Sequence, residues 1–548
     1  MTSESPGDLE MDDPSPTWSS RWRIGALCAC VLLTVLALIS YGDSQEGREY
    51  GPDEGTYSYV GWAWGHGEWP YLDSWDHKGA PVYGVTLLRS LLAGGPEPGA
   101  LGHQELVLGG AMAIMIGVIA HMLWGGLGFG LGLFFGVVLW TRGGPANGHM
   151  STPGSIIGLL TAAAIASALA SRYRTSFSAR AGGALLVGAT GGLAFCTKPN
   201  ALSGLALGLL LLLTSNQVRG WRARLGLVGF TALGAIVPIA VVAIIFNYGS
   251  ALGEMLDACI NFNQIRGRSI LAGVSPLTLA RNVKQSLESV DLLAPLVAIL
   301  AVSVHASWSA WTRRDGSGGL ESSAVVILWL AAELAILVSN GGYTHHTYTV
   351  LPAAALGCAW VVSAPIAGSR RGVPISLALF SLLAIPALLE MRQADPSSDP
   401  ETSELDRLVA IVKETTNESD RILVPFGWEG TALLCRTQRL SASRYTYPIP
   451  LYTAGYANDD RWRELVDIIE GATPPALIVI PGELRDVPSG QQMPRRLLTK
   501  EVFPHQARFI GVVSEKYLSE RIGQFGLYRL RTEPDPPAQK PKLANRDK

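Results

Sequence analysis

The sequence has little charge and few cysteines, and each shortage excludes a class of protein. Only 16% of its 548 residues are charged, whereas 48% are apolar, and the mean hydropathy is +0.25. A chain of this composition is embedded in lipid over much of its length, so we interpret it as a polytopic membrane protein. The six cysteines follow no disulfide or metal-ligand spacing, and we interpret all of them as packing residues.

The signals of nucleic-acid and nucleotide binding are also missing from the sequence. The net charge is −2, and no basic cluster is interleaved with aromatic residues in the way that a strand-binding groove requires. We therefore expect no nucleic-acid partner. The sequence also shows no internal repeat and no Gly-rich phosphate loop, which argues against nucleotide handling by the C-terminal part of the chain.

Long apolar runs predict about eleven membrane-spanning helices. They lie at 24–41, 105–124, 125–140, 153–170, 181–196, 200–214, 223–246, 290–310, 320–339, 346–366 and 373–391. Arg21 and Arg23 precede the first run and predict a cytoplasmic N-terminus, and the later basic connections alternate with poorer ones. The apolar stretch 80–95 is too short to cross a membrane, so we expect a juxtamembrane helix on the outer surface there.

Composition divides the chain into a helical membrane domain, 21–391, and a smaller C-terminal domain, 401–531. The polar ends, 1–20 and 532–548, predict disordered tails, and 392–400 predicts a linker. An amphipathic helix is expected around Leu405, Leu408, Val409 and Val412. A helix at 461–469 and strands at 421–426, 476–480, 508–513 and 526–530 complete a predicted α/β domain. The odd number of spans places this domain outside the membrane, which we expect to be the plasma (inner) membrane.

The first outer loop, 42–104, concentrates charged and aromatic residues. Its centre, 51–81, carries Asp53, Glu54, Asp76, His77 and Lys78 among four of the fifteen tryptophans. Such a segment is typical of the membrane interface. The Asp53–Glu54 pair leaves two interpretations open. The two carboxylates could act in catalysis, or they could mark the N-terminus of a helix with Asp53 as its cap.

The Pro-Asp-Glu followed by a tyrosine, the run Trp-Pro-Tyr-x-Asp-x-Trp-Asp, and Lys78 resemble the first outer loop of GT-C membrane glycosyltransferases. The resemblance is to the branch of protein O-mannosyltransferases and lipid A aminoarabinose transferases, glycosyltransferase family 39. It implies a GT-C fold and transfer of a monosaccharide from a polyprenyl-phosphate carrier to an acceptor outside the membrane, with inversion. It further implies that Asp53 is the catalytic base, and that Glu54 and Asp76 orient the sugar or tune Asp53.

The resemblance also implies which residues bind the carrier phosphate. Lys78 stands at the place of the family's phosphate-binding lysine, although the proline that follows this lysine in the family is displaced here to position 81. Arg266 lies in a loosely matching segment, NQIRGR (263–268). The stretch GGYTHHTYTVLP resembles the family's aromatic and histidine stretch near the end of a late helix, and its candidates are Tyr343, His345, His346 and Tyr348. As alternatives, Lys78 could snorkel to the interface, and Arg266 could contact lipid phosphates.

One departure from the family pattern lies before the fourth span. The family often has an acidic residue before a proline there, whereas residues 147–153 read NGHMSTP. The role of that acid would fall to Asp76 or His149. Two further residues stay open: Lys198 could face the cavity or the interface, and Glu333, in the middle of a span, could have a functional role or, as we expect, pair with a polar neighbour such as His305.

Metal binding and two other functions are the remaining alternatives. Adjacent His345 and His346 do not point to the same face of a helix, so a structural zinc is not expected. A divalent cation between Asp53 or Asp76 and a histidine stays open. The rival functions are a lipid or solute transporter or flippase, and a non-catalytic scaffold. The absent repeat and the acidic, Trp-rich loop favour the transferase, with a lipid, protein or polysaccharide as the acceptor.

Overall fold

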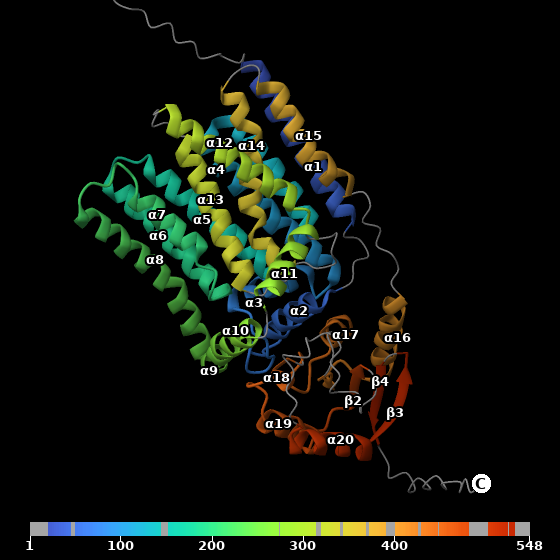
Figure 1. The fold of residues 1–548 in the computed structure, drawn as a ribbon. Helices are drawn as coiled ribbons and strands as arrows, with labels where there is room; N and C mark the ends of the chain where they lie inside the picture. Colours follow the sequence, from blue (N-terminus) through green and yellow to red (C-terminus); the bar gives the residue numbers. More distant parts are fainter. Residues whose placement is uncertain are drawn as a thin grey trace, which may run out of the picture.

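The computed structural model describes residues 20–44, 50–143, 152–272, 275–313, 319–339, 344–368, 372–390, 400–425, 429–447, 449–481, 502–523 and 525–531. Figure 1 shows long helices at one end of the molecule, a layer of short helices below them, and the C-terminal strands and helices at the other end. The predicted tails and most of the predicted linker lie outside the described residues.

Every apolar run that predicts a span is helical. The elements are α1 (Ser20–Ser44), α4 (Pro98–Gly143), α5 (Thr152–Arg172), α6 (Phe177–Thr197), α7 (Ser203–Leu213), α8 (Trp221–Tyr248), α12 (Leu293–Arg313), α13 (Gly319–Ser339), η3 (Thr344–Thr349) with α14 (Leu351–Gly368), and α15 (Gly372–Glu390). Within the described residues, α4, α5, α6 and α8 are long and apolar enough to cross a membrane. A fifth span results if α12 is counted together with α11 (Pro276–Glu288), which meets it at 99°. The chain is therefore a multi-pass membrane protein.

Helix α4 is a hairpin of two helices rather than one rod. Gly125 has φ +77° inside it, a conformation that only glycine adopts without strain. The chain folds back there, because a Cβ on Gly136 would meet the backbone of Ala113 at 2.9 Å, and one on Gly109 would meet the ring of Trp140. The structure confirms the sequence prediction of separate helices at 105–124 and 125–140.

A layer of short helices lies between the long helices and the C-terminal region (Figure 1). It consists of α2 (Pro52–Gly65), α3 (Ala80–Ala93), α9 (Leu252–Leu256), the π-helix η2 (Asp257–Phe262), α10 (Asn263–Ala272) and α11. Helix α3 is the helix predicted at 80–95. Its side chains Leu88, Leu91 and Leu92 are exposed, as expected of a helix that dips into a lipid interface.

The C-terminal region contains a four-stranded sheet in the order β1-β2-β4-β3. Strand β1 (Ile422–Leu423) pairs in parallel with β2 (Leu477–Pro481), and β4 (Phe525–Leu530) pairs antiparallel with both β2 and β3 (Tyr517–Ile522). The helices of this region are α16 (Pro400–Thr415), α17 (Glu429–Thr437), α18 (Ile449–Tyr452), α19 (Asp459–Glu470) and α20 (Pro504–Lys516). Leu408 and Val412 of α16 are fully buried, which confirms the predicted amphipathic helix.

One predicted strand of this region is wrong. Residues 508–513 lie within helix α20, which begins at Pro504, a favoured first helical residue. Phe509, Val512 and Val513 are buried at helical spacing, whereas a short apolar run alone does not distinguish a strand from a buried helix. The sequence analysis also missed the edge strand β3, because its four central residues, 518–521, are exposed and give no apolar signal.

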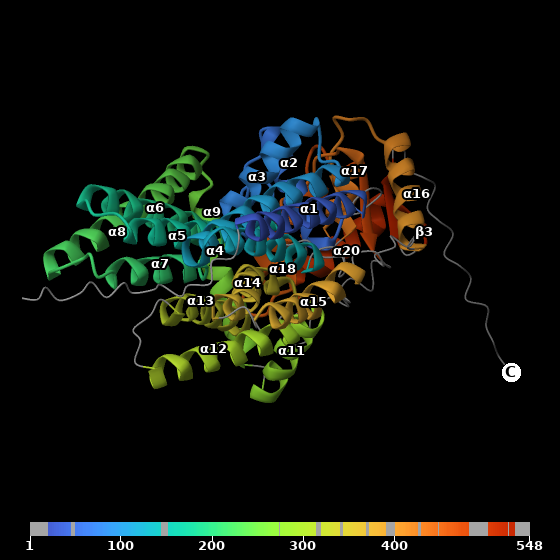
Figure 2. The same cartoon turned by 90° about the horizontal axis from the view of Figure 1, so that it is seen from above.

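The C-terminal region shares its apolar core with the layer of short helices, which is called the outer layer below. One continuous buried cluster joins residues of α2, α3 and η2 to residues of α16, α17, α19 and the sheet. Gly55 of α2 lies so close to α17 that a Cβ on it would approach Thr431 Oγ1 to 3.0 Å. Figure 2 shows the sheet and α16 at the opposite end of the molecule from α6, α7 and α8. The layer of short helices therefore packs against both the helix bundle and the C-terminal region.

Glu333 is fully buried in α13, within the helix bundle. Its carboxylate accepts hydrogen bonds from Ser203 Oγ of α7 at 2.5 Å and from Trp329 Nε1 at 3.3 Å. A polar neighbour was expected, and the structure provides one from α7. The side chain of His305 lies outside the described residues.

Candidate active site

The N-terminus of α2 positions the predicted catalytic carboxylates. Gly51 is the N-cap, Pro52 is the first helical residue, and Asp53 and Glu54 occupy the first turn. Glu54 is buried, and one of its carboxylate oxygens accepts a hydrogen bond from the Gly51 backbone nitrogen at 2.6 Å. The helix-terminus interpretation of this pair is thus confirmed, with Gly51 rather than Asp53 at the cap. The catalytic role of Asp53 stays a prediction, as does that of Glu54.

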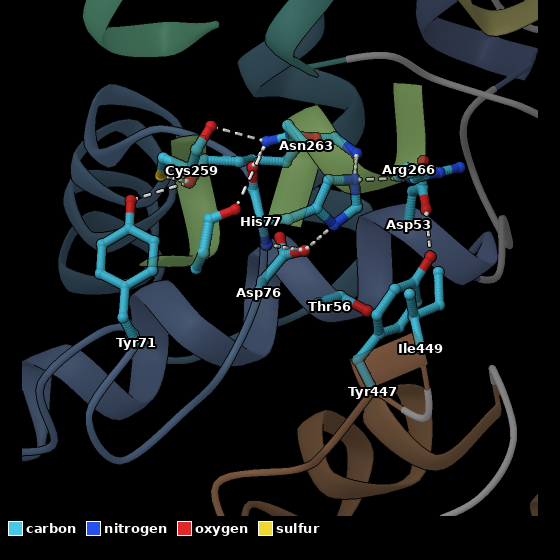
Figure 3. A network of polar contacts seen from close by, with 12 residues as sticks. Asp53, Thr56, Tyr71, Asp76, His77, Cys259, Asn263, Arg266, Tyr447 and Ile449 are labelled. Carbon is cyan, nitrogen blue, oxygen red and sulfur yellow. Dashed lines mark hydrogen bonds and ion pairs between the residues drawn. The ribbon is translucent and has the colours of Figure 1, made fainter. Parts of the chain in front are cut away.

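Asp53 is half-buried and lies between two buried tyrosines. Tyr447, from the C-terminal region, donates a hydrogen bond to Asp53 Oδ1 at 3.4 Å, as Figure 3 shows. Tyr57, one turn further along α2, also forms a hydrogen bond with Asp53. Two tyrosine hydroxyls therefore lie beside the carboxylate as hydrogen-bond donors.

Asp76 and His77 form a buried pair just before α3. One Asp76 oxygen lies 3.0 Å from His77 Nδ1 and accepts the His77 backbone N–H at 2.7 Å, while Tyr83 donates to the other oxygen at 2.7 Å. Burial raises the pKa of Asp76, but the hydrogen bonds and charge of its neighbours outweigh burial and hold that pKa below its ordinary value. Asp76 is therefore ionised, and its carboxylate fixes the position of His77.

His77 in turn contacts the side chains of a lysine and an arginine. Lys78 Nζ and Arg266 Nη1 each lie 2.9 Å from His77 Nε2. Because lysine and arginine are donors only, Nε2 accepts, and the single ring proton lies on Nδ1, facing Asp76. Burial and the charge of Lys78 lower the pKa of His77 to about 4, so the ring is neutral at pH 7. The outer loop and α10 thus bring Lys78 and Arg266 together through one imidazole (Figure 3).

A close approach of two chain segments places a second lysine beside the first. The Gly79 N–H donates to the Thr197 carbonyl at 3.0 Å, and a Cβ on Gly79 would meet the Cys196 oxygen at 1.7 Å. Only glycine fits at this contact between the start of α3 and the end of α6. Lys78 precedes Gly79 and Lys198 follows Thr197, so the contact sets the two ammonium groups on the wall of one pocket.

The pocket lies at the end of the helix bundle that meets the short helices. It is lined by Tyr57, Lys78, Pro153, Gly154, Ile157, Lys198, Asn200, Ala201, Ile336, His346 and Thr349. Lys198 Nζ lies 3.3 Å from His346 Nδ1. Burial, followed by the charges of Lys78 and Arg266, lowers the pKa of Lys198 well below its ordinary value. Two lysines and an arginine this close together are suited to a bound anion.

The structure brings some predicted residues together and separates others from the pocket. His346 lies on the pocket wall, whereas Tyr348 is buried in the apolar core of the bundle. Tyr343, His149 and the side chain of His345 lie outside the described residues. Within the part of the chain that the structure describes, no three His, Cys, Asp or Glu side chains are grouped as metal ligands.

The sequence analysis missed Tyr447 and Tyr57 as neighbours of Asp53, and it left the location of Lys198 open. Tyr447 lies 394 residues after Asp53, and no local pattern links such distant positions. Lys198 carried a usable signal, since it breaks an apolar helix at the same end of the bundle as the first outer loop. Only the contact between Gly79 and Thr197 shows that Lys198 faces the pocket rather than the membrane interface.

The helix bundle and its outer amphipathic layer define the GT-C fold, the fold of a class of membrane glycosyltransferases. Among solved structures, the chain is similar to the crystal structure of ArnT from Cupriavidus metallidurans bound to undecaprenyl phosphate. The identity is 16% and the TM-score 0.56, over 91% of this chain and 97% of that chain. This similarity confirms the fold predicted from the first outer loop.

Two other solved structures are similar with lower TM-scores. ArnT from C. metallidurans in the apo state is 15% identical, with a TM-score of 0.44 over 92% of this chain and 98% of that chain. The oligosaccharyltransferase of Archaeoglobus fulgidus, in complex with Zn and sulfate, is 12% identical, with a TM-score of 0.48 over 83% and 68%. No protein-family model matches the sequence, and no curated protein matches it.

Proposed function

We propose that the protein is a membrane glycosyltransferase that transfers a monosaccharide from a polyprenyl-phosphate carrier to an acceptor outside the membrane. One observation carries the proposal: a pocket with Lys78 and Lys198 on its wall lies close to the half-buried carboxylate of Asp53, and Arg266 contacts the same His77 nitrogen as Lys78. The cations are suited to a phosphate that leaves, and the carboxylate is suited to a hydroxyl or amine that attacks.

The arrangement supports a direct displacement. The acceptor O–H or N–H gives its proton to Asp53, while its lone pair forms the new bond to the anomeric carbon. The bond between that carbon and the phosphate oxygen breaks, and its electron pair stays on the phosphate. Lys78, Lys198 and Arg266 stabilise the added negative charge. A single displacement from the face opposite the phosphate inverts the anomeric carbon.

The charge state of Lys198 supports a phosphate in particular. Its pKa is lowered by burial and by neighbouring cations. A phosphate in the pocket would oppose both effects and favour the ammonium form, so that binding would take up a proton. Asp76 would contribute indirectly by fixing the His77 tautomer, because only a neutral ring with an unprotonated Nε2 accepts from both Lys78 and Arg266. The neighbour ArnT was crystallised with undecaprenyl phosphate, a carrier of the proposed class.

The test is transfer of labelled sugar from polyprenyl-phosphate hexoses and pentoses in proteoliposomes. The native protein should release label to an acceptor, and Asp53→Asn should lower the rate by about 100- to 10,000-fold, the usual contribution of a general base. Carrier binding and thermal stability of this variant should stay native-like, because the amide retains the shape of the carboxylate. Carrier binding without transfer by the native protein, across a panel of donors and acceptors, would instead support the scaffold.

A further inference from the structure

Tyr447 links the C-terminal region to the predicted base. Its hydroxyl donates to Asp53 Oδ1 at 3.4 Å, and its ring stacks on His77 with centroids 6.2 Å apart and planes at 24°. The residue is 3% exposed. In Figure 3 it reaches up from the C-terminal segment and points at Asp53, beside Arg266. One buried phenol thus touches both the carboxylate and the imidazole that holds two cations.

The backbone that carries Tyr447 is attached to the first outer loop. The Ser441 N–H donates to Tyr59 Oη at 2.7 Å, and the Trp75 N–H donates to the Arg444 carbonyl at 2.7 Å. The partners come from α2 and from the segment that leads to Asp76. Because both contacts involve buried groups, they fix the segment before Tyr447 relative to Asp53.

A salt bridge attaches the same segment to a second part of the outer layer. The Arg444 guanidinium lies 2.8 Å from Glu254 of α9, close to the π-helix that precedes Arg266. The segment 441–447 therefore contacts α2, which carries Asp53, the segment that leads to Asp76, and α9, which precedes the π-helix and α10. Its rigidity would preserve the orientation of Tyr447.

We propose that Tyr447 is a positioning residue, supplied by the C-terminal region, that keeps Asp53 oriented and ionised for proton removal. The inference rests on the proposed transferase function. A hydrogen bond from a neutral phenol to a carboxylate favours the charged form of that carboxylate. At 3.4 Å the bond is long, and hydrogen bonds of this kind often tighten when substrate enters a catalytic site.

Other groups also act on Asp53, and they limit the expected effect. Tyr57 donates from the same helix, and Lys198, after α6, lies close enough for the two charges to interact. Asp76 and Arg266 act on Tyr447 with opposite signs. Loss of the Tyr447 hydroxyl should therefore weaken proton removal rather than abolish it. The rate should fall about tenfold, and the acid limb of the pH–rate profile should move up by about 0.5 to 1 pH unit.

The experiment compares full-length native protein, Tyr447→Phe and Tyr517→Phe in the proteoliposome transfer assay. Tyr517 is a matched control, because it is a buried tyrosine of the same region whose hydroxyl donates to the Pro475 carbonyl at 3.1 Å, just before β2. Each variant is measured for kcat, for KM of the donor, for the pH–rate profile and for thermal unfolding.

The expected result for Tyr447→Phe is a lower kcat, an unchanged donor KM and an acid limb at higher pH, with a native profile for Tyr517→Phe. Native kcat and profile in Tyr447→Phe would overturn the inference and leave the transferase standing. So would a loss of rate without a pH shift, since it would mark Tyr447 as a packing residue. Absence of transfer by the native protein would overturn the proposed function, and the inference with it.

Discussion

The two ends of the segment 51–81, the centre of the first outer loop, each carry a carboxylate near the pocket, and the surroundings of the two carboxylates differ. At the N-terminus of α2, Asp53 is half-buried beside a pocket whose wall carries Lys78 and Lys198. Near the other end of the segment, Asp76 is 1% exposed and accepts from Tyr83 and from the His77 backbone. The surroundings of Asp53 are suited to proton transfer from a substrate, whereas those of Asp76 are suited to stabilising the fold.

The difference explains how one loop can hold several acids with separate roles. A buried carboxylate whose oxygens are both hydrogen-bonded stabilises its surroundings and cannot easily change partners. A half-buried carboxylate can meet a substrate proton without breaking the fold. We therefore expect Asp53 variants to change turnover, and Asp76 and Glu54 variants to change stability. The three predictions below test this division, from the largest expected effect on stability to the smallest.

Asp76→Ala should have the largest effect. Removing a buried, ionised carboxylate leaves the Tyr83 hydroxyl and the His77 backbone N–H without their acceptor, and it exposes His77 to two cations without a counter-charge. Breaking a buried charged network of this kind costs about 3–5 kcal/mol. Thermal or denaturant unfolding in detergent micelles measures the loss. Equal stability of Asp76→Ala and Asp53→Asn would contradict the division.

The division of roles shows where sequence reasoning stops. The helices followed from apolar runs, and even the break at Gly125 was predicted, because membrane helices depend on local composition. Asp53, Lys78 and Arg266 followed from a resemblance in short motifs. The separate environments of Asp53 and Asp76 did not, because they depend on contacts that only the folded chain creates: Tyr447, 394 residues away, donates to Asp53, and Tyr83 of α3 donates to Asp76.

The C-terminal sheet shows the same limit. Buried strands such as β2 gave apolar signals, but β3 is stabilised by pairing with β4 and has a polar sequence. Helix α20 contains the apolar run 508–513, which the sequence analysis predicted to be a strand, because a short apolar run fits a strand and a buried helix equally well. The strand β3 and the helix α20 are determined by strand pairing and by burial, and neither can be seen in the sequence alone.

The pH dependence of stability sharpens the comparison, because it reports on His77. Burial and Lys78 lower the pKa of this histidine to about 4, below the ordinary value of about 6.5 in the unfolded chain. Between these two values the unfolded state binds more protons than the folded state, so stability falls as pH falls from about 6.5 to 4. The loss attributable to His77 should reach about 3 kcal/mol at the lower end.

His77→Gln isolates this contribution, because its amide oxygen can accept from Lys78 and Arg266 but does not titrate. The comparison is of unfolding free energy for native protein and variant, measured at intervals from pH 7 to pH 4. Asp76 does not confuse the result, since its own pKa lies below the ordinary value of 3.8 and its contribution is lost only under more acidic conditions. Identical pH slopes for the two proteins would show that His77 is not buried beside these cations.

Glu54→Gln should have the smallest effect. The amide retains an oxygen that accepts from the Gly51 N–H, so the capping contact of α2 survives while the negative charge at the N-terminus of the helix is lost. Loss of that charge costs about 0.3–1 kcal/mol, whereas Glu54→Ala also removes the cap and should cost roughly 1 kcal/mol more. Unfolding experiments measure both steps, and the transfer assay measures turnover. If Glu54→Gln matched Asp53→Asn in loss of turnover while its stability stayed native-like, Glu54 would share the chemical role of Asp53, and the proposed division between the carboxylates of this loop would be wrong.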